Sequence, residues 1–222
     1  MTSNQLKWIA IITMIIDHVG AVLFKEYILF RIIGRIAFPI FAFLLTEGFL
    51  HTHDKKKYAL RLGVFALVSE IPFNLAFYNN PWDLSHQNIF FTLLIGLLCL
   101  WIYETWHERH RWLSIGGVYL FALLADVLRT DYGLFGVLLI FILYQTKTLK
   151  GKAIVIITMN VLLAGLNLLA GATVVLEIYA GLSAIFVFMY NGKKGKGIKY
   201  VFYLIYPFHL ALLYLIKLFL IA

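Results

Sequence analysis

The sequence predicts an all-α fold, a polytopic transmembrane helical bundle of about nine spans (8–10 fit the pattern). Of its 222 residues, 62% are hydrophobic and only 14% are charged, whereas soluble globular domains carry about 25% charged residues. Apolar stretches also recur from end to end, and each approaches the roughly 20 residues that cross a bilayer as a helix. We therefore expect a single integral-membrane domain over residues 1–222.

The apolar stretches define the expected helices in order. Three long spans open the chain, three shorter ones follow, and three more complete it. Their ranges are 5–24, 29–50, 58–78, 88–103, 112–128, 132–146, 152–169, 173–190 and 199–221. The segment "ADVLRTDYG" between the fifth and sixth spans predicts a turn or a re-entrant bend.

Loop charges predict the orientation of the bundle. The odd loops hold only Lys25 and Arg129. The even loops hold Lys55, Lys56 and Lys57, then Arg109 and Arg111, then Lys147, Lys150 and Lys152, and finally Lys193, Lys194, Lys196 and Lys199. Because short cytoplasmic loops carry the excess of Lys and Arg, we expect a cytoplasmic N-terminus and an outer C-terminus. This topology signal explains the net charge of +8 without a nucleic-acid partner.

Polar side chains interrupt the segments expected to lie in lipid. Asp17 and His18 stand side by side in "TMIIDHVGAVLF", and Arg35 and Glu70 lie in the second and third spans. An aspartate at the centre of a membrane helix costs roughly 2.5–3.5 kcal/mol on insertion scales, so a functional role is the default reading. A rise of about 1.5 Å per residue places His18, Arg35 and Glu70 roughly 18–21 Å from the inner membrane edge. They converge on the outer half of the membrane.

The second span presents two arginines on one face. Arg31 and Arg35 are four residues apart and therefore lie on neighbouring turns. Their guanidinium groups need anions, and the candidates are Asp17, Glu70, and the phosphate or carbonyl oxygens of a ligand. A structural ion-pair network with Glu70 is the alternative.

His18 is the candidate base, because histidine titrates near neutral pH without assistance. Asp17 and His18 point about 100° apart on a helix, so a direct relay between them is not expected. We expect Glu70, from another helix, to orient the imidazole. His209, in "YPFHL", is left open between a functional residue and one that satisfies carbonyls freed at Pro207.

Further polar residues lie toward the outer face. Asn74 falls within about two turns of the His18 layer. We expect Asn74, His86 and Asn88 to bind substrate, and His86, Asn88, Asp126 and Asp131 to form a wetted mouth. Ordinary loop and cap residues are the alternative.

Three segments resemble the TraX family. They are "LKWIAIITMIIDHVG", "FRIIGRIAFPIFAFLLTEGFLHT" and "KKYALRLGVFALVSEIPFNLAF", and the resemblance extends, more weakly, to the C-terminus. The family resembles the wider transmembrane acyltransferase superfamily. That resemblance implies His18 as base or acyl carrier, and Arg31 and Arg35 as the arginine motif. The arginine spacing of four, rather than three, departs from the superfamily pattern.

The resemblance implies an acetyltransferase in the bacterial cytoplasmic membrane. Acetyl-CoA would be the cytoplasmic donor, no metal is expected, and the acceptor would be an extracytoplasmic amine or hydroxyl on a peptide or glycan. Arg35 or Asn74 would stabilise the oxyanion, while direct transfer and an acetyl-histidine intermediate both stay open. The alternatives are a proton-coupled small-solute transporter, which also buries ionisable residues at mid-depth, and a membrane assembly or scaffold protein. The sequence does not indicate the oligomeric state.

Overall fold

The computed structural model describes residues 1–196 and 199–221, and the side chains of Lys199 and Ile221 lie outside the described part. The all-α prediction is confirmed, because the described residues form helices and only one isolated bridge, Gln87–Thr130. The helices are α1 (Ser3–Val22), α2 (Ile28–Gly34), α3 (Ala37–His51), α4 (Lys55–Tyr78), α5 (Ile89–Trp106), α6 (Arg111–Val127), α7 (Gly133–Gln145), α8 (Leu149–Leu169), α9 (Glu177–Ala180), α10 (Ser183–Phe188) and α11 (Lys199–Ile221).

The helices have the length and composition of a membrane protein. Each expected span coincides with one helix or with two consecutive short ones. Within the described residues, six helical stretches are long and apolar enough to cross a bilayer. They are Ser3–Val22, Ile28–His51, Lys55–Tyr78, Ile89–Trp106, Leu149–Leu169 and Tyr200–Leu220. The chain is therefore a membrane protein, and nine spans stay a prediction.

The second expected span is broken, and the break positions an arginine. Proline lacks an N–H, and its ring clashes with the carbonyl four residues earlier. For Pro39 that carbonyl belongs to Arg35, and α2 ends at Gly34 while α3 begins at Ala37. Arg35 thus lies at the break between α2 and α3, which Pro39, four residues later, favours.

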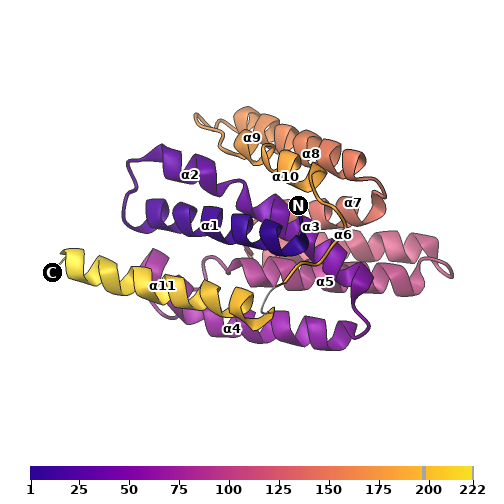
Figure 1. Ribbon diagram of the computed structural model, residues 1–222, viewed down its shortest axis with the longest axis horizontal. Coiled ribbons are helices and arrows are strands. Elements are labelled where there is room, and N and C mark those ends of the chain that lie inside the picture. The colour runs from indigo at the N-terminus through magenta and orange to yellow at the C-terminus, as the bar shows by residue number, and fades with distance from the viewer. Residues whose placement is uncertain (197–198, 222) are drawn as a thin grey trace.

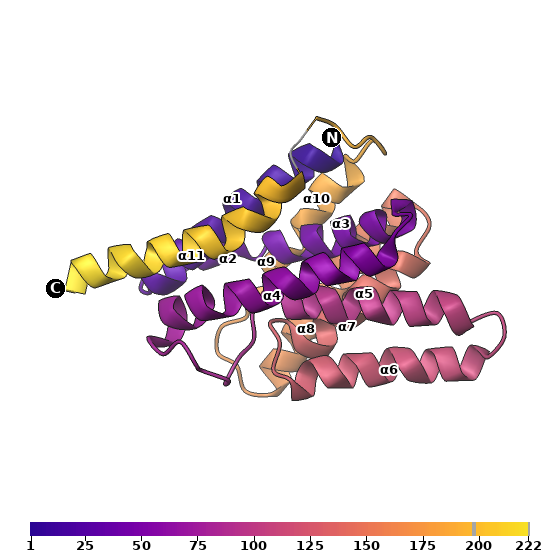
Figure 2. The same ribbon diagram turned by 90° about the horizontal axis from the view of Figure 1, so that it is seen from below.

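The helices lie side by side along the long axis of the molecule (Figures 1 and 2), and the last helix returns to the first. α11 packs on α4 and α1, while α1 also packs on α2 and α3. α5, α6 and α7 form a neighbouring group, and α8 to α10 cover α3 and α7. This topology brings residues near both chain ends to one place.

Two glycines allow α1 and α2 to approach closely. A Cβ on Gly20 would lie 2.3 Å from Cβ of Phe30, and a Cβ on Gly34 would lie 2.1 Å from Cβ of Asp17. Small residues permit such close backbone approach between membrane helices. The α1–α2 contact therefore depends on these positions having no side chain.

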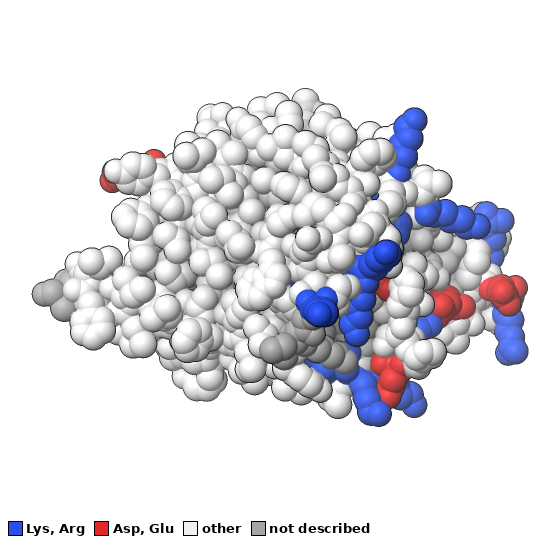
Figure 3. All heavy atoms as spheres, in the orientation of Figure 1, with Lys and Arg blue, Asp and Glu red and all other residues white. Residues whose placement is uncertain are grey.

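Lys and Arg side chains gather at one end of the molecule (Figure 3). The α3–α4, α5–α6 and α7–α8 connections lie at this end, and the C-terminus lies at the opposite tip (Figure 1). Backbone hydrogen bonds from Ser3 and Asn4 to Lys193 and Lys194 tie the N-terminus to the basic segment before α11. Lys199, which we assigned to that basic segment, has its side chain outside the described part.

One of the expected loop lysines is instead buried. Lys152 is 5% exposed, in the first turn of α8, and its Nζ donates to Glu47 of α3 at 2.8 Å. We counted Lys152 among the loop charges and also as the first residue of the expected span 152–169. The structure places it inside the helix, because α8 begins at Leu149.

Single cysteines test the predicted orientation. The native Cys99 is 1% exposed in α5, so a Cys99→Ala background keeps labelling specific. We expect Lys194→Cys to react with a membrane-impermeant maleimide only from the cytoplasmic side, and Asn80→Cys only from the outer side. Labelling of both positions from one side would contradict the topology.

Candidate functional site

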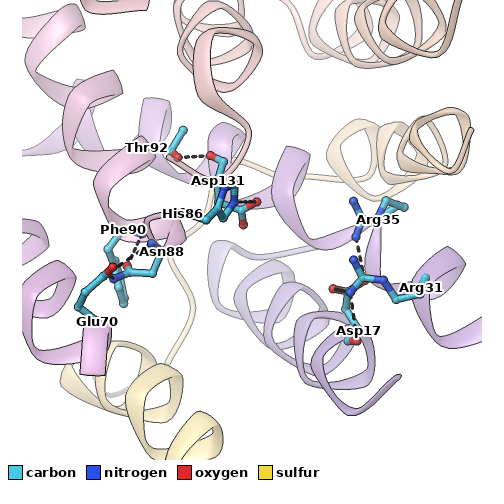
Figure 4. A network of polar contacts seen from close by, with 9 residues as sticks. All are labelled: Asp17, Arg31, Arg35, Glu70, His86, Asn88, Phe90, Thr92 and Asp131. Carbon is cyan, nitrogen blue, oxygen red and sulfur yellow. Dashed lines mark hydrogen bonds and ion pairs between the residues drawn. The ribbon is translucent and has the colours of Figure 1, made fainter. Parts of the chain in front are cut away.

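The most concentrated charge in the bundle is an aspartate held between two arginines (Figure 4). Arg31 Nη1 lies 2.5 Å from Asp17 Oδ2, and Arg35 Nη2 lies 3.2 Å from Asp17 Oδ1. Asp17 is 8% exposed. The structure thus pairs both arginines with Asp17, one of the two acidic candidates that the sequence offered.

His18 is hydrogen-bonded to a histidine from the other end of the chain. Its Nδ1 lies 2.7 Å from Nε2 of His209 in α11, and the ring planes are 7° apart. Nδ1 of His209 lies 2.8 Å from the carbonyl oxygen of Ile205. Phe77 and Tyr206 meet the His18 ring edge-on, with centroids at 5.4 and 5.9 Å.

Glu70 does not orient His18, so that expectation was wrong. Glu70 Oε2 accepts from the side-chain amide of Asn88 and, at 3.4 Å, from its backbone N–H. Asn88 is the N-cap of α5, where its Oδ1 accepts from Phe90 N at 3.0 Å and its Nδ2 donates to Ala66 O at 2.8 Å. Glu70 therefore belongs to the junction between α4 and α5, because it is hydrogen-bonded to Asn88, the N-cap residue of α5.

Asn74 and Asn88, expected to bind substrate, instead bind the backbone. Asn74 is 1% exposed, and its Nδ2 donates to the carbonyl oxygens of Pro81 and Asp83 at 3.3 and 2.8 Å. These bonds hold the loop that precedes Asn88. Neither asparagine lines the cavities described below.

Two outer loops are joined beside the arginine cluster (Figure 4). Gln87 N donates to Arg129 O and Asp131 N donates to Gln87 O, both at 2.9 Å. The bridge places His86 Nε2 3.7 Å from Asp131 Oδ1. The Asp131 carboxylate raises the pKa of His86 above its usual value, so His86 loses its charge, and the ion pair is lost, as pH rises through the raised pKa.

His18 and the arginine cluster line a cavity of about 220 Å³. It is called here the outer cavity, because the predicted orientation places it toward the outer face of the membrane. Asp17, Arg31, Arg35, His86 and Asp131 supply its polar wall. Its apolar wall includes Phe73, Phe77, Phe38, Tyr78 and Tyr132. Of the expected mouth residues, His86 and Asp131 line the cavity and Asn88 and Asp126 do not.

A larger cavity of about 490 Å³, called here the inner cavity, extends from the basic end. Lys7, Arg61 and Lys194 line it together with Glu47 and His51. The two cavities share four lining residues, Met14, Phe41, Ile89 and Tyr206. The inner and outer cavities therefore adjoin at these four residues.

Some site residues had no clear sequence signal. Tyr132, whose ring stacks on Phe38 at 3.8 Å, and Tyr206 both line the outer cavity but look like ordinary interfacial aromatics in the sequence. His209 had a signal, because an intramembrane histidine is unusual. Its partner could not be identified, since nothing in the sequence shows that α11 packs on α1.

Comparisons with known proteins found one protein family and several relatives. The family described as "TraX protein" matches residues 2–217. The probable fimbrial assembly protein FimC, serogroup H1, of Dichelobacter nodosus is 33% identical, over 97% of this chain and 96% of its own length. Protein TraX of Escherichia coli is 26% identical, over 67% of this chain and 57% of its own length. Protein TraX of Escherichia coli strain K12 is also 26% identical, over 73% of this chain and 64% of its own length. No solved structure matches the chain.

Proposed function

This chain belongs to the TraX family, and we propose that it is a membrane-embedded acyltransferase. It moves an acetyl group from cytoplasmic acetyl-CoA to an amine or hydroxyl on the outer side of the cytoplasmic membrane. One observation carries the proposal: His18 and a pair of arginines line one small cavity that adjoins a larger cavity at the basic end.

The inner cavity suits the donor. Lys and Arg side chains recognise phosphate through charge-assisted hydrogen bonds, and Lys7, Arg61 and Lys194 line this cavity. Farther in, its walls are apolar and aromatic, with Leu45 and Phe90 among them, which suits the uncharged pantetheine arm. In this proposal the thioester reaches the residues at which the cavities adjoin.

The chemistry at His18 is an ordinary acyl transfer. The acceptor nitrogen or oxygen attacks the thioester carbon, its bond to that carbon forms, and the carbon–sulfur bond breaks. His18 takes the acceptor's proton and returns it to the coenzyme A thiolate, so the products are acetylated acceptor and free thiol. An acetyl group carried transiently on His18 gives the same products.

Arg35 is the proposed donor to the developing oxyanion. It lines the outer cavity beside His18 and carries a planar fork of N–H donors. Preorganised donors in a site that excludes water typically contribute about 2.7–4 kcal/mol to such a transition state. Asp17 fixes the guanidinium by holding Nη2.

The relatives' names bear on the acceptor. One relative is named as a probable fimbrial assembly protein, which favours an exported protein over a glycan. We therefore propose a peptide amine, at the membrane surface, as the first acceptor to test.

A solute transporter is the second candidate. Two adjoining cavities would also suit a protein that opens alternately to each side. The two candidates differ chemically, because only the acyltransferase releases free thiol from acetyl-CoA.

Arg35→Lys tests the proposal directly. The lysine keeps the charge but loses the planar donor fork, so we expect acetyl-CoA-dependent thiol release to fall about 100-fold or more. Arg109→Lys, in the exposed α5–α6 connection, is the matched control and should behave as the unmodified protein. Equal activity of both variants would mean that Arg35 supplies only charge, and no thiol release from any variant or acceptor would favour the transporter.

A further inference from the structure

We propose that His209 is a positioning residue that fixes the tautomer of His18, so that Nε2 of His18 faces the outer cavity with a free lone pair. The catalytic role of this tautomer rests on the proposed function, whereas the His18–His209 contact itself does not depend on that function.

A backbone carbonyl group of α11 determines which nitrogen of His209 carries the proton. A carbonyl oxygen only accepts hydrogen bonds, so the 2.8 Å contact with Ile205 O requires a proton on Nδ1 of His209. In a neutral imidazole the other nitrogen is then an acceptor. Nε2 of His209 therefore accepts at the 2.7 Å contact, and the proton between the rings belongs to Nδ1 of His18.

The proton on Nδ1 of His18 leaves Nε2 as the reactive atom of this ring. With its proton on Nδ1, neutral His18 has a bare Nε2. Within the described residues Nε2 has no hydrogen-bond partner, and His18 lines the outer cavity. A bare ring nitrogen at a cavity wall is the arrangement that a general base or an acyl carrier needs.

The two carboxylates near His18 are bound elsewhere, so His209 is the residue that holds the tautomer of His18. Asp17, the adjacent carboxylate, is held by Arg31 and Arg35, and Glu70 is held by Asn88. In a serine protease triad a carboxylate holds the histidine tautomer. Here the neutral imidazole of His209, which is held by a backbone carbonyl of α11, has the role of that carboxylate.

The structural alternative for His209 fits the contacts less well. The carbonyl that Pro207 leaves without its helical donor is that of Tyr203, four residues earlier. His209 instead contacts Ile205. Its ring, 6% exposed, thus connects α11 to His18 rather than repairing the helix at the proline.

Nitrogen NMR of ¹⁵N-histidine-labelled protein tests the tautomer without any catalytic assay. The His18 signals are assigned by their loss in His18→Gln. We expect a protonated Nδ1 and an unprotonated Nε2 on His18 in the resting protein. A proton on Nε2, or an averaged mixture of the two tautomers, would overturn the proposal even if the protein proves to be an acyltransferase.

Kinetics then test the purpose of the pair. His209→Leu removes the acceptor, and we expect kcat for thiol release to fall about 10- to 100-fold, less than for loss of the base itself, with KM for acetyl-CoA unchanged. His209→Gln retains an oxygen that can accept from His18 Nδ1, and should restore part of the rate. A change in KM alone, or equal losses in both variants, would contradict a positioning role. If the tautomer is as expected but no protein releases thiol, the proposed function fails and the His18–His209 assignment stands.

Discussion

Replacing His18 by alanine is expected to lower acyl transfer by at least roughly 100-fold, the lower end of what a general base contributes. The expectation follows from the position of His18, which lines the outer cavity beside Arg31 and Arg35 and is bonded to His209. The measurement is thiol release from acetyl-CoA by the purified protein with a peptide amine as acceptor.

The controls for His18→Ala separate chemistry from folding. The substitution leaves Nε2 of His209 without its partner, and an unsatisfied buried acceptor costs about 1–3 kcal/mol, so thermal unfolding must be measured alongside the rate. His110→Ala, in the exposed α5–α6 connection, should retain full activity. Near-normal turnover of a folded His18→Ala protein would end the assignment of His18 as the base.

A second large effect is expected from one methyl group at Gly34. Its Cβ would lie 2.1 Å from both Cβ and Oδ1 of Asp17, too close for either helix to stay in place. Overpacking alone costs about 1–3 kcal/mol. Where Asp17 is also displaced from its arginines, the buried charges left without a partner would cost about a further 3–5 kcal/mol. We expect Gly34→Ala to lower the unfolding temperature and to lose activity with it.

Gly165→Ala is the matched control for Gly34. Gly165 also lies within a helix, but a Cβ there would meet nothing within 4 Å. Because alanine is favoured over glycine in helices by about 0.8–1.0 kcal/mol, this variant should be as stable as the unmodified protein or more so. Equal behaviour of the two alanine variants would contradict the close α1–α2 contact around Asp17.

The helices were predictable because each one depends on the composition of its own stretch of sequence. A stretch of apolar residues near the length of a bilayer must satisfy its own backbone, and a helix does so. The bend at Arg35 was not predicted, because residues 29–50 were expected to form one span. Pro39 favours the bend, but Pro72 and Pro207 lie inside the continuous helices α4 and α11, so a proline alone does not identify a break. The split between the short helices α9 and α10 was not predicted, because residues 173–190 are mostly apolar and were expected to form one span, although Gly181 lies where α9 ends.

The site was predictable only where few partners existed. Arg31 and Arg35 needed an anion at their depth, and Asp17 was one of two candidates. Glu70 seemed equally suitable for His18, but the sequence does not show that Asn88 caps α5 beside it. The His18–His209 pair joins residues 191 positions apart, so only the packing of α11 on α1 reveals it.

The two cavities predict that the donor and the acceptor approach from opposite sides of the membrane. The inner cavity is lined by lysines and arginine at the basic end, which the loop charges place in the cytoplasm. The outer cavity holds His18 beneath the joined loops of His86 and Asp131. Acetyl-CoA is too highly charged to cross lipid, so the side on which it is consumed is measurable.

Sealed vesicles of known orientation give that measurement. Two preparations receive acetyl-CoA on one side and the peptide acceptor on the other, in the two possible arrangements, and a third receives both substrates on the cytoplasmic side. The acetylated peptide is quantified by mass spectrometry. We expect product only when acetyl-CoA is on the cytoplasmic side and the acceptor is on the outer side, and no product in the reverse arrangement. Equal yields with both substrates confined to the cytoplasmic side would contradict transfer across the membrane through the His18 site.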